Sequence, residues 1–166
     1  MAKIKIVTAP ESYDNFGDDC KFIFLAGTID NGDSYDWQKD ICEFAETLDT
    51  GDGETYVICN PRRERWNPRA GREELKEQIE WELKALKRSG LILMNILEDS
   101  KSPITLLEMG LFKDCPGLNV FCPSGFYRFM NVEVTCKEFG IRLYETNETD
   151  NIKEILKSYV RRNIWK

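Results

Sequence analysis

Short apolar runs alternate with longer amphipathic segments along most of the chain. The runs are rich in β-branched and aromatic residues and predict strands at 3–7, 21–26, 55–59, 91–96, 118–122 and 141–144. The amphipathic segments predict helices at 35–48, 72–89, 103–113, 131–139 and 150–162. Continuous apolar runs such as Phe22–Ala26 are typical of strands buried on both faces, and the helices between them imply parallel crossovers. The pattern therefore predicts an α/β three-layer sandwich, with ligands at the carboxyl ends of a mainly parallel sheet.

The 166 residues are expected to form one domain. Hydrophobic residues make up 42% of the chain, which is enough for a sizeable core, and no repeat or linker interrupts the pattern. Residues 9–19 are polar and rich in turn formers, so they predict an arm or loop. Residues 60–71 form a longer loop than tight packing requires, and long loops in compact domains are often functional.

Composition disfavours several classes of protein. The longest apolar runs are far too short to cross a bilayer, so no membrane association is expected. The net charge of -6 disfavours nucleic-acid binding, which usually requires a basic surface. The six cysteines show neither zinc-site spacing nor a disulfide framework, and no signal peptide follows Met1. A cytoplasmic protein is therefore expected.

The absence of histidine restricts the possible chemistry. Nucleophile systems of the Ser-His and Cys-His type are excluded, as is a metal site with histidine ligands. Acid–base chemistry must rest on carboxylates, Lys, Tyr or Cys, and we expect neither a metal nor a cofactor. No GxGxxG or P-loop pattern follows a strand, so binding of dinucleotides or nucleoside triphosphates lacks its main sequence support.

Glu108, in the helix predicted at 103–113, is the strongest chemical signal. Ser102 suits the N-cap of this helix and Pro103 suits its first position. The neighbours of Glu108 three and four positions away are Ile104, Thr105, Leu111 and Phe112, so its carboxylate is expected to face the core. Burying an unpaired carboxylate is costly or raises its pKa. A catalytic carboxylate explains such a position, and a structural ion pair is the alternative.

Glu82 is expected to be a second inward carboxylate. It falls on the same helical stripe as Leu75, Ile79 and Leu86, and Gln78 lies one turn before it. The alternative is a structural carboxylate that is hydrogen-bonded to loop amides. Two inward carboxylates in a chain without histidine suit a glycosidase-type mechanism.

Other polar positions are candidates for ligand binding. Gly27 and Thr28 follow the second strand, where a glycine lets the backbone approach a ligand, although a bare turn explains them equally. Asn131 is placed to reach a ligand or to cap the helix predicted to begin there. A local basic island suits an anion such as phosphate, or is simply a solvated loop; its members are Arg62, Arg63, Arg65, Arg69 and Arg72.

Five short motifs carry a resemblance to a known family. They are Phe24-Leu-Ala-Gly27, Asn60-Pro-Arg-Arg63, Gln78-Ile-Glu-Trp-Glu-Leu83, Ser102-Pro-Ile-Thr-Leu-Leu-Glu-Met-Gly110 and Cys122-Pro-Ser-Gly-Phe-Tyr-Arg128 with Asn131-Val-Glu133. In kind and order they resemble the nucleoside 2-deoxyribosyltransferase-like family. The motif-bearing core covers about residues 20–145, after a strand and arm at 1–19 and before a C-terminal helix within 146–166. The resemblance implies a flavodoxin-like (Rossmann-like) five-stranded sheet and a homo-oligomer whose sites are completed by a neighbouring subunit.

The resemblance also implies roles for individual residues. Glu108 is the nucleophile, Glu82 assists departure or binding of the base, and Asn131 reaches the sugar in the adjacent subunit's site. The implied binding residues are Gly27, Thr28, Asn60, Arg62, Arg63, Gln78, Ser102 and Asn131. The implied reaction is cleavage of an N-glycosidic bond and deoxyribosyl transfer between nucleobases, through a covalent intermediate on Glu108. The partners are then a nucleoside or nucleotide and a free nucleobase.

Two positions depart from the better-studied transferases. Ile23 stands where they carry a Tyr in their first strand, and Ser102 stands where they carry an Asp six residues before the nucleophile. A Ser at this position resembles the related 2′-deoxynucleoside 5′-monophosphate N-glycosidases, in which serines help to hold the phosphate. The alternatives are therefore such a hydrolase, or a non-catalytic nucleotide-binding module with the same fold.

Overall fold

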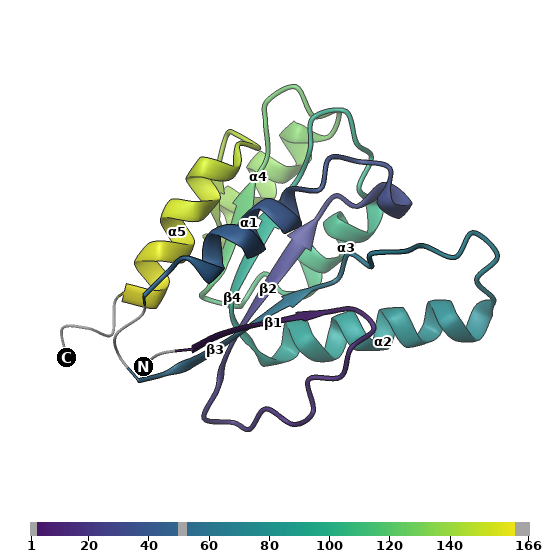
Figure 1. Cartoon of the computed structure of the whole chain (residues 1–166). Helices are drawn as coiled ribbons and strands as arrows, with labels where there is room; N and C mark the ends of the chain where they lie inside the picture. The colour runs from purple at the N-terminus through teal and green to yellow at the C-terminus, as the bar shows by residue number, and fades with distance from the viewer. Residues whose placement is uncertain (1–2, 50–52, 162–166) are drawn as a thin grey trace.

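The computed structural model describes residues 3–49 and 53–161 (Figure 1). Its elements are β1 (Lys3–Thr8), β2 (Lys21–Gly27), the 3₁₀ helix η1 (Asp30–Gly32), α1 (Trp37–Glu46), β3 (Thr55–Asn60), α2 (Arg72–Arg88), β4 (Ser89–Asn95), α3 (Pro103–Leu111), β5 (Leu118–Phe121), α4 (Phe129–Phe139), β6 (Arg142–Tyr144) and α5 (Thr149–Arg161). Every predicted strand and helix is present, with bounds that differ by at most two residues. Residue 162, where the last helix is predicted to end, lies outside the described residues. No helix in the described ranges combines the length and the apolar character needed to cross a membrane.

The strands within the described residues form one parallel sheet of six, in the order β1-β3-β2-β4-β5-β6. The five-stranded sheet that the resemblance implies is one strand short, because β1 adds an edge strand. It pairs with β3 along its whole length, from Lys3 opposite Thr55 to Thr8 opposite Asn60. The other five strands have the flavodoxin-like order. Successive strands are added on one side of β2 and then, from β4 onward, on its other side, so the strand order reverses between β2 and β4.

Two hydrophobic cores lie on the two faces of the sheet. Alternate side chains of a strand point to opposite faces, so Phe22 and Phe24 of β2 pack with α2, α3 and α4. Ile23 and Leu25 pack on the other face with α1 and α5, which lie side by side in Figure 1. The predicted three-layer arrangement is confirmed. Ile23 therefore faces the layer opposite to the one that contains Glu108.

Residues 9–19 form the predicted arm, which packs along α2. The hydroxyl of Tyr13 donates to the carbonyl of Trp81 at 2.7 Å, and the Trp81 indole N–H donates to the carbonyl of Glu11 at 2.7 Å. The guanidinium of Arg88 lies 3.8 Å from the centre of the Phe22 ring. These contacts fix the C-terminal half of α2 against the sheet.

The N-terminal half of α2 extends beyond the body of the domain (Figure 1). Leu75 and Ile79, which were expected to face inward with Glu82, are 55% and 53% exposed. The buried positions of this helix are Gln78, Ala85 and Leu86. Periodicity predicts an apolar side of α2, but the helix is longer than the layer it covers, so part of that side faces solvent.

Candidate active site

Most of the predicted site residues lie at the carboxyl edge of the sheet. β2 ends at Gly27, β3 ends at Asn60, and Ser102 is the residue that precedes α3. Sheets with this strand order bind ligands at this edge, beside the reversal between β2 and β4. The fold thus brings together segments that are far apart in the sequence.

Glu108 is 7% exposed on the inner side of α3, beside Thr105 and Met109. Within the part of the chain that the structure describes, its carboxylate has neither a hydrogen-bond partner nor an ion pair. Burial and the negative charge of Glu82 raise the pKa of Glu108 to about 8. The structural ion pair considered for Glu108 is therefore absent among the described residues, and its carboxyl keeps its proton to higher pH than an ordinary glutamate.

Glu82 is partly buried on α2 and belongs to a chain of polar side chains. The Nε2 atom of Gln78 donates to Glu82 Oε1 at 2.7 Å and to the carbonyl of Pro61 at 3.0 Å. The Nε atom of Arg63 donates to Gln78 Oε1 at 2.6 Å. The pKa of Glu82 is raised overall, because the effect of burial exceeds that of the hydrogen bond from Gln78 and the charge of Arg63, which both lower it. We refer to Glu82 and Glu108 as the carboxylate pair.

Three buried hydroxyl groups connect β2 to the loop before α3. Thr28 Oγ1 lies 2.7 Å from Ser102 Oγ and 3.0 Å from Ser100 Oγ, and the two serine hydroxyls lie 2.8 Å apart. The backbone N–H of Leu97 also donates to Thr28 Oγ1, at 3.0 Å. Ser102 is the N-cap residue of α3, as predicted, but its hydroxyl does not cap the helix and bonds within this hydroxyl cluster instead.

Gly27 is required by the packing of β2 against β4. Its φ of 131° is in the region that favours glycine, and a Cβ there would lie 2.0 Å from the carbonyl oxygen of Asn95. The close backbone approach expected at Gly27 is therefore an approach to the neighbouring strand. The carbonyl of the next residue, Thr28, accepts a hydrogen bond of 3.0 Å from the indole of Trp37.

Arg62 and Arg63, the two arginines of the basic island that the resemblance makes binding residues, have different environments. Arg62 is buried, donates to the carbonyl of Gly32 at 3.0 Å and lies 3.6 Å from the carboxylate of Asp36. Its backbone N–H donates to Asn60 Oδ1 at 3.0 Å. The Arg62 side chain thus joins the β3–α2 loop to the segment before α1, and Asn60 holds the backbone of Arg62 at the start of that loop. Arg63 instead contacts Gln78, which bonds to Glu82.

Asn131 lies within the first turn of α4, and the N-cap residue of this helix is Arg128. Of the two alternatives for Asn131, the one in which it caps the helix is wrong, because the helix begins earlier, at Phe129. Its side chain is exposed and lines a hollow of about 300 Å³ with Leu106 and Met109 of α3. The carboxylate pair does not line this hollow.

Large apolar side chains are exposed on α3, on α4 and in the loop before α4. We call six of them the α3–α4 face: Ile104, Leu107, Leu111, Tyr127, Met130 and Val134. Phe139, at the end of α4, is exposed as well. Ile104 and Leu111 were expected in the core as neighbours of Glu108. They are exposed because α3 is apolar on its outer side as well as on its inner side. Apolar side chains exposed singly are normal, whereas a contiguous group of them marks a contact with another molecule.

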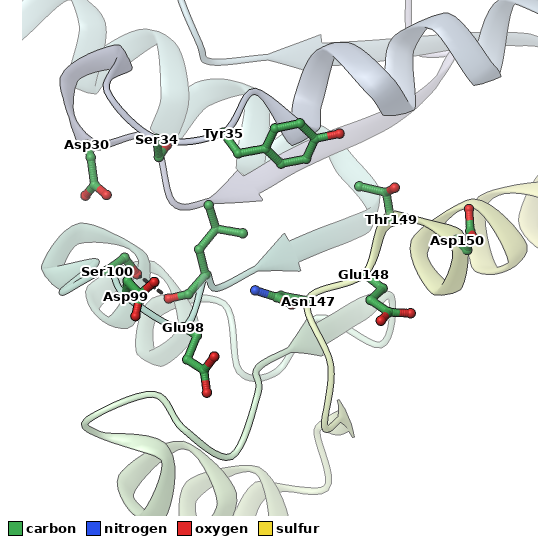
Figure 2. A pocket seen from close by; sticks show the side chains of 11 residues that line it. Asp30, Ser34, Tyr35, Glu98, Asp99, Ser100, Asn147, Glu148, Thr149 and Asp150 are labelled. Carbon is green, nitrogen blue, oxygen red and sulfur yellow. Dashed lines mark hydrogen bonds between the residues drawn. The ribbon is translucent and has the colours of Figure 1, made fainter.

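An acidic pocket of about 670 Å³ lies between the loops that precede α1, α3 and α5 (Figure 2). Its five carboxylates belong to Asp30, Glu98, Asp99, Glu148 and Asp150, and no lysine or arginine of the described residues lines it. Ser100 belongs both to this pocket and to the hydroxyl cluster. No sequence pattern predicts the pocket, although the acidic residues Glu98 and Asp99 follow the predicted fourth strand after one residue, Leu97. Over the described ranges, no group of three or more Cys, Asp or Glu side chains is arranged to hold a metal ion.

Comparison with known families gives one match. A family model described as nucleoside 2-deoxyribosyltransferase like matches residues 20–126, which is more than half of the chain. The matched region includes the carboxylate pair and the hydroxyl cluster, and it excludes β1 and Asn131. A comparison with curated proteins found no significant match.

Proposed function

The chain belongs to the nucleoside 2-deoxyribosyltransferase-like family, and on that basis we propose that it transfers a 2′-deoxyribosyl group from a nucleoside to another nucleobase. The family implies small ligands of the nucleoside and nucleobase type. The observation that carries the proposal is the carboxylate pair, in which burial and the charge of Glu82 raise the pKa of Glu108. Perturbed carboxyl groups of this kind cluster at functional sites.

In the proposed reaction, Glu108 attacks C1′ through an oxocarbenium-like transition state and forms a covalent deoxyribosyl ester. Glu82 protonates or hydrogen-bonds the departing base. A second base then attacks C1′ from the vacated side, which gives net retention of configuration. The missing 2′-OH makes positive charge at C1′ easier to form, so two carboxyl groups supply the chemistry without a metal.

The alternative reaction is hydrolysis of the N-glycosidic bond of a 2′-deoxynucleoside 5′-monophosphate. The surroundings of Ser102 do not favour it. The Ser102 hydroxyl is already bonded to Thr28 and Ser100, and Arg62 is bound to the segment before α1. The acidic pocket next to Ser100 would repel a phosphate dianion through like charges. These features support a substrate without a 5′-phosphate.

A non-catalytic binding module is the other alternative. Such a module gains nothing from two interacting carboxyl groups that are partly or fully buried, since their desolvation costs stability. The presence of both carboxyl groups in this chain supports the proposal that it is an enzyme.

We also propose a homo-oligomer with shared active sites, built from single-domain chains. Six large apolar side chains on the α3–α4 face favour contact with another chain, and closed symmetric assemblies are the common result for soluble proteins. Asn131 lies on α4 beside this face, so a symmetric contact would bring it towards α3 of the other chain. The six cysteines, all within the described ranges, are free thiols, which supports a cytoplasmic location.

A base-exchange assay tests the proposed function. Purified protein is incubated with a 2′-deoxynucleoside and a different, isotopically labelled free base, and the products are separated by chromatography. Transfer gives the labelled deoxynucleoside, whereas hydrolysis gives only free base and deoxyribose. No reaction of the folded protein with any common deoxynucleoside, with or without acceptor, contradicts the proposal.

A further inference from the structure

Both atoms of the Gln78 side-chain amide, Nε2 and Oε1, form hydrogen bonds within the candidate site. Gln78 is 8% exposed, its Nε2 donates to Glu82 and to the carbonyl of Pro61, and its Oε1 accepts from Arg63. The Pro61 carbonyl can only accept and the Arg63 guanidinium can only donate. These two partners therefore fix the orientation of the amide, with its N–H group towards Glu82.

The two members of the carboxylate pair differ in their hydrogen-bond donors and in the charges near them. Glu82 receives a 2.7 Å hydrogen bond from Gln78, and a donated hydrogen bond stabilises the charged form of a carboxylate. The charge of Arg63 acts in the same direction. Glu108 has no donor among the described residues, and the charge that acts on it is that of Glu82. Of the two carboxyl groups, Glu108 is therefore the one on which a proton is favoured.

Building on the proposed function, we propose that Gln78 is a positioning residue that keeps Glu82 ionised and so holds the pair's one proton on Glu108 before substrate binds. Gln78 does not itself touch the reacting atoms in this account. It acts through Glu82, whose Oε1 atom it occupies, and it leaves Oε2 of Glu82 for proton transfer.

The proposed resting state supplies the proton that the first step consumes. As Glu108 bonds to C1′, the C1′–N bond breaks and its electron pair goes to the base nitrogen. The proton of Glu108 passes to Glu82 and from there to that nitrogen, so Glu82 returns to its ionised form. A neutral acid and a nucleoside thus become an ester and a neutral base, and charge and protons balance. The second step is the reverse with a new base.

The charged groups that act on the pair come from two elements besides α3. Glu82 lies on α2, and Arg63 lies in the β3–α2 loop. Burial and Glu82 raise the pKa of Glu108 to about 8, and no group among the described residues lowers it. The pKa of Glu82 is also raised, by burial, but Gln78 and Arg63 limit this rise. This difference in environment agrees with the assignment made from the hydrogen bonds.

A titration of the ligand-free protein tests the inference. The side-chain carboxyl carbons of glutamate are labelled with ¹³C, assigned with the variants Glu82→Gln and Glu108→Gln, and followed by NMR between about pH 4 and pH 10. In the wild type, Glu108 should keep its proton to higher pH than Glu82. Gln78→Met has a similar volume but no donor, so the titration of Glu82 should move up by about one to two pH units. The titration of Glu108 should move down, because a neutral Glu82 no longer repels its charged form.

Two further variants complete the design. Gln38→Met removes another buried glutamine, which lies on α1 and contacts neither carboxyl group, so both titrations should stay in place. Arg63→Met leaves the bond between Gln78 and Glu82 intact and should give a smaller shift in the same direction as Gln78→Met. If Gln78→Met does not fold, Arg63→Met and the wild-type order decide the question.

Unchanged titrations in a folded Gln78→Met protein would overturn the inference, as would a wild type in which Glu82 is the carboxyl that holds its proton longer. The measurement needs no substrate. A wild type that titrates as described but does not act on deoxynucleosides rejects the proposed function and leaves the role of Gln78 in the pair standing.

Discussion

The hydroxyl groups of Thr28 and Ser102 lie 2.7 Å apart and join the end of β2 to the start of α3. Ser100 completes this cluster and also lines the acidic pocket. A substrate group that extends past the N-terminus of α3 would therefore meet hydroxyls that are already bonded to one another, and beyond them a group of carboxylates. This relationship bears directly on whether the substrate carries a 5′-phosphate.

We predict that deoxynucleosides are better substrates than their 5′-monophosphates, by about tenfold or more in kcat/KM, because like charges near a protein surface cost on the order of 1 kcal/mol or more per pair. The preference should shrink at high salt and in the variants Glu98→Gln and Asp99→Asn. Glu138→Gln, an exposed position on α4 away from the pocket, is the control with the same change in net charge. A preference for monophosphates that is lost in Ser102→Ala would instead favour the hydrolase.

Glu82→Gln should slow the reaction in proportion to the need for a proton on the leaving group. We expect a loss of about 10²–10⁴-fold with a natural deoxynucleoside, the usual range for general acid catalysis. The loss should be much smaller with a p-nitrophenyl deoxyriboside, whose leaving group needs no proton. Steady-state kinetics on both substrates give the comparison. Equal losses on the two would mean that Glu82 has only a structural role.

Glu108→Gln should make the protein more stable at pH 8 than the wild type. The pKa of Glu108 in the folded protein is about 8, above its ordinary value of 4.5, so the folded state binds more protons than the unfolded state between these values. The free energy of unfolding of the wild type should then fall as pH rises through this window, by on the order of a few kcal/mol.

Denaturation at pH 5 and pH 8 measures this effect. The advantage of Glu108→Gln should be present at pH 8 and largely lost at pH 5, where Glu108 is protonated in the folded wild type. Glu80→Gln, an exposed glutamate on α2, is the control and should follow the wild type. Parallel pH profiles for Glu108→Gln and the wild type would contradict the raised pKa.

If Asn131 completes the site of a neighbouring chain, two inactive variants should complement each other. Glu108→Gln and Asn131→Ala are mixed under conditions of subunit exchange, and activity is measured. In a random dimer about half of the molecules are mixed and each has one intact site, so about a quarter of the sites should recover. The same mixture without exchange is the control. No recovery despite proven exchange, or an active monomer by light scattering, would restrict Asn131 to its own chain.

Local sequence patterns predict the elements of this fold well, because strands and helices depend on neighbouring residues. They predict the burial of Glu108 from the apolar character of its neighbours three and four positions away, and this reason is only partly right. Thr105 beside it is buried, but Ile104 and Leu111 are exposed. Periodicity identifies apolar sides of α3 and does not distinguish a side that meets the sheet from one left open on the surface.

The connections within the site depend on tertiary contacts that no local pattern contains. Thr28 and Ser102 are 74 positions apart in the sequence. Arg62 and Arg63 are neighbours, yet the first is bound to the segment before α1 and the second to Gln78 on α2. Sequence reasoning singled out all of these residues as substrate contacts, whereas the bridging role of Gln78 between Arg63 and Glu82 required coordinates.

Trapping the covalent intermediate tests most directly the central claim that Glu108 is the nucleophile. Fluorine next to C1′ destabilises the oxocarbenium-like transition states. With a 2-fluorinated deoxynucleoside, the covalent ester on the enzyme should therefore react only slowly and accumulate. Mass spectrometry of the intact protein and of its peptides should show one fluorinated deoxyribosyl group, located on Glu108 and released when a free base is added. Glu108→Gln should show no adduct and should lose about 10⁴-fold in activity. An adduct on another residue, or full activity of a folded Glu108→Gln protein, would contradict the assignment.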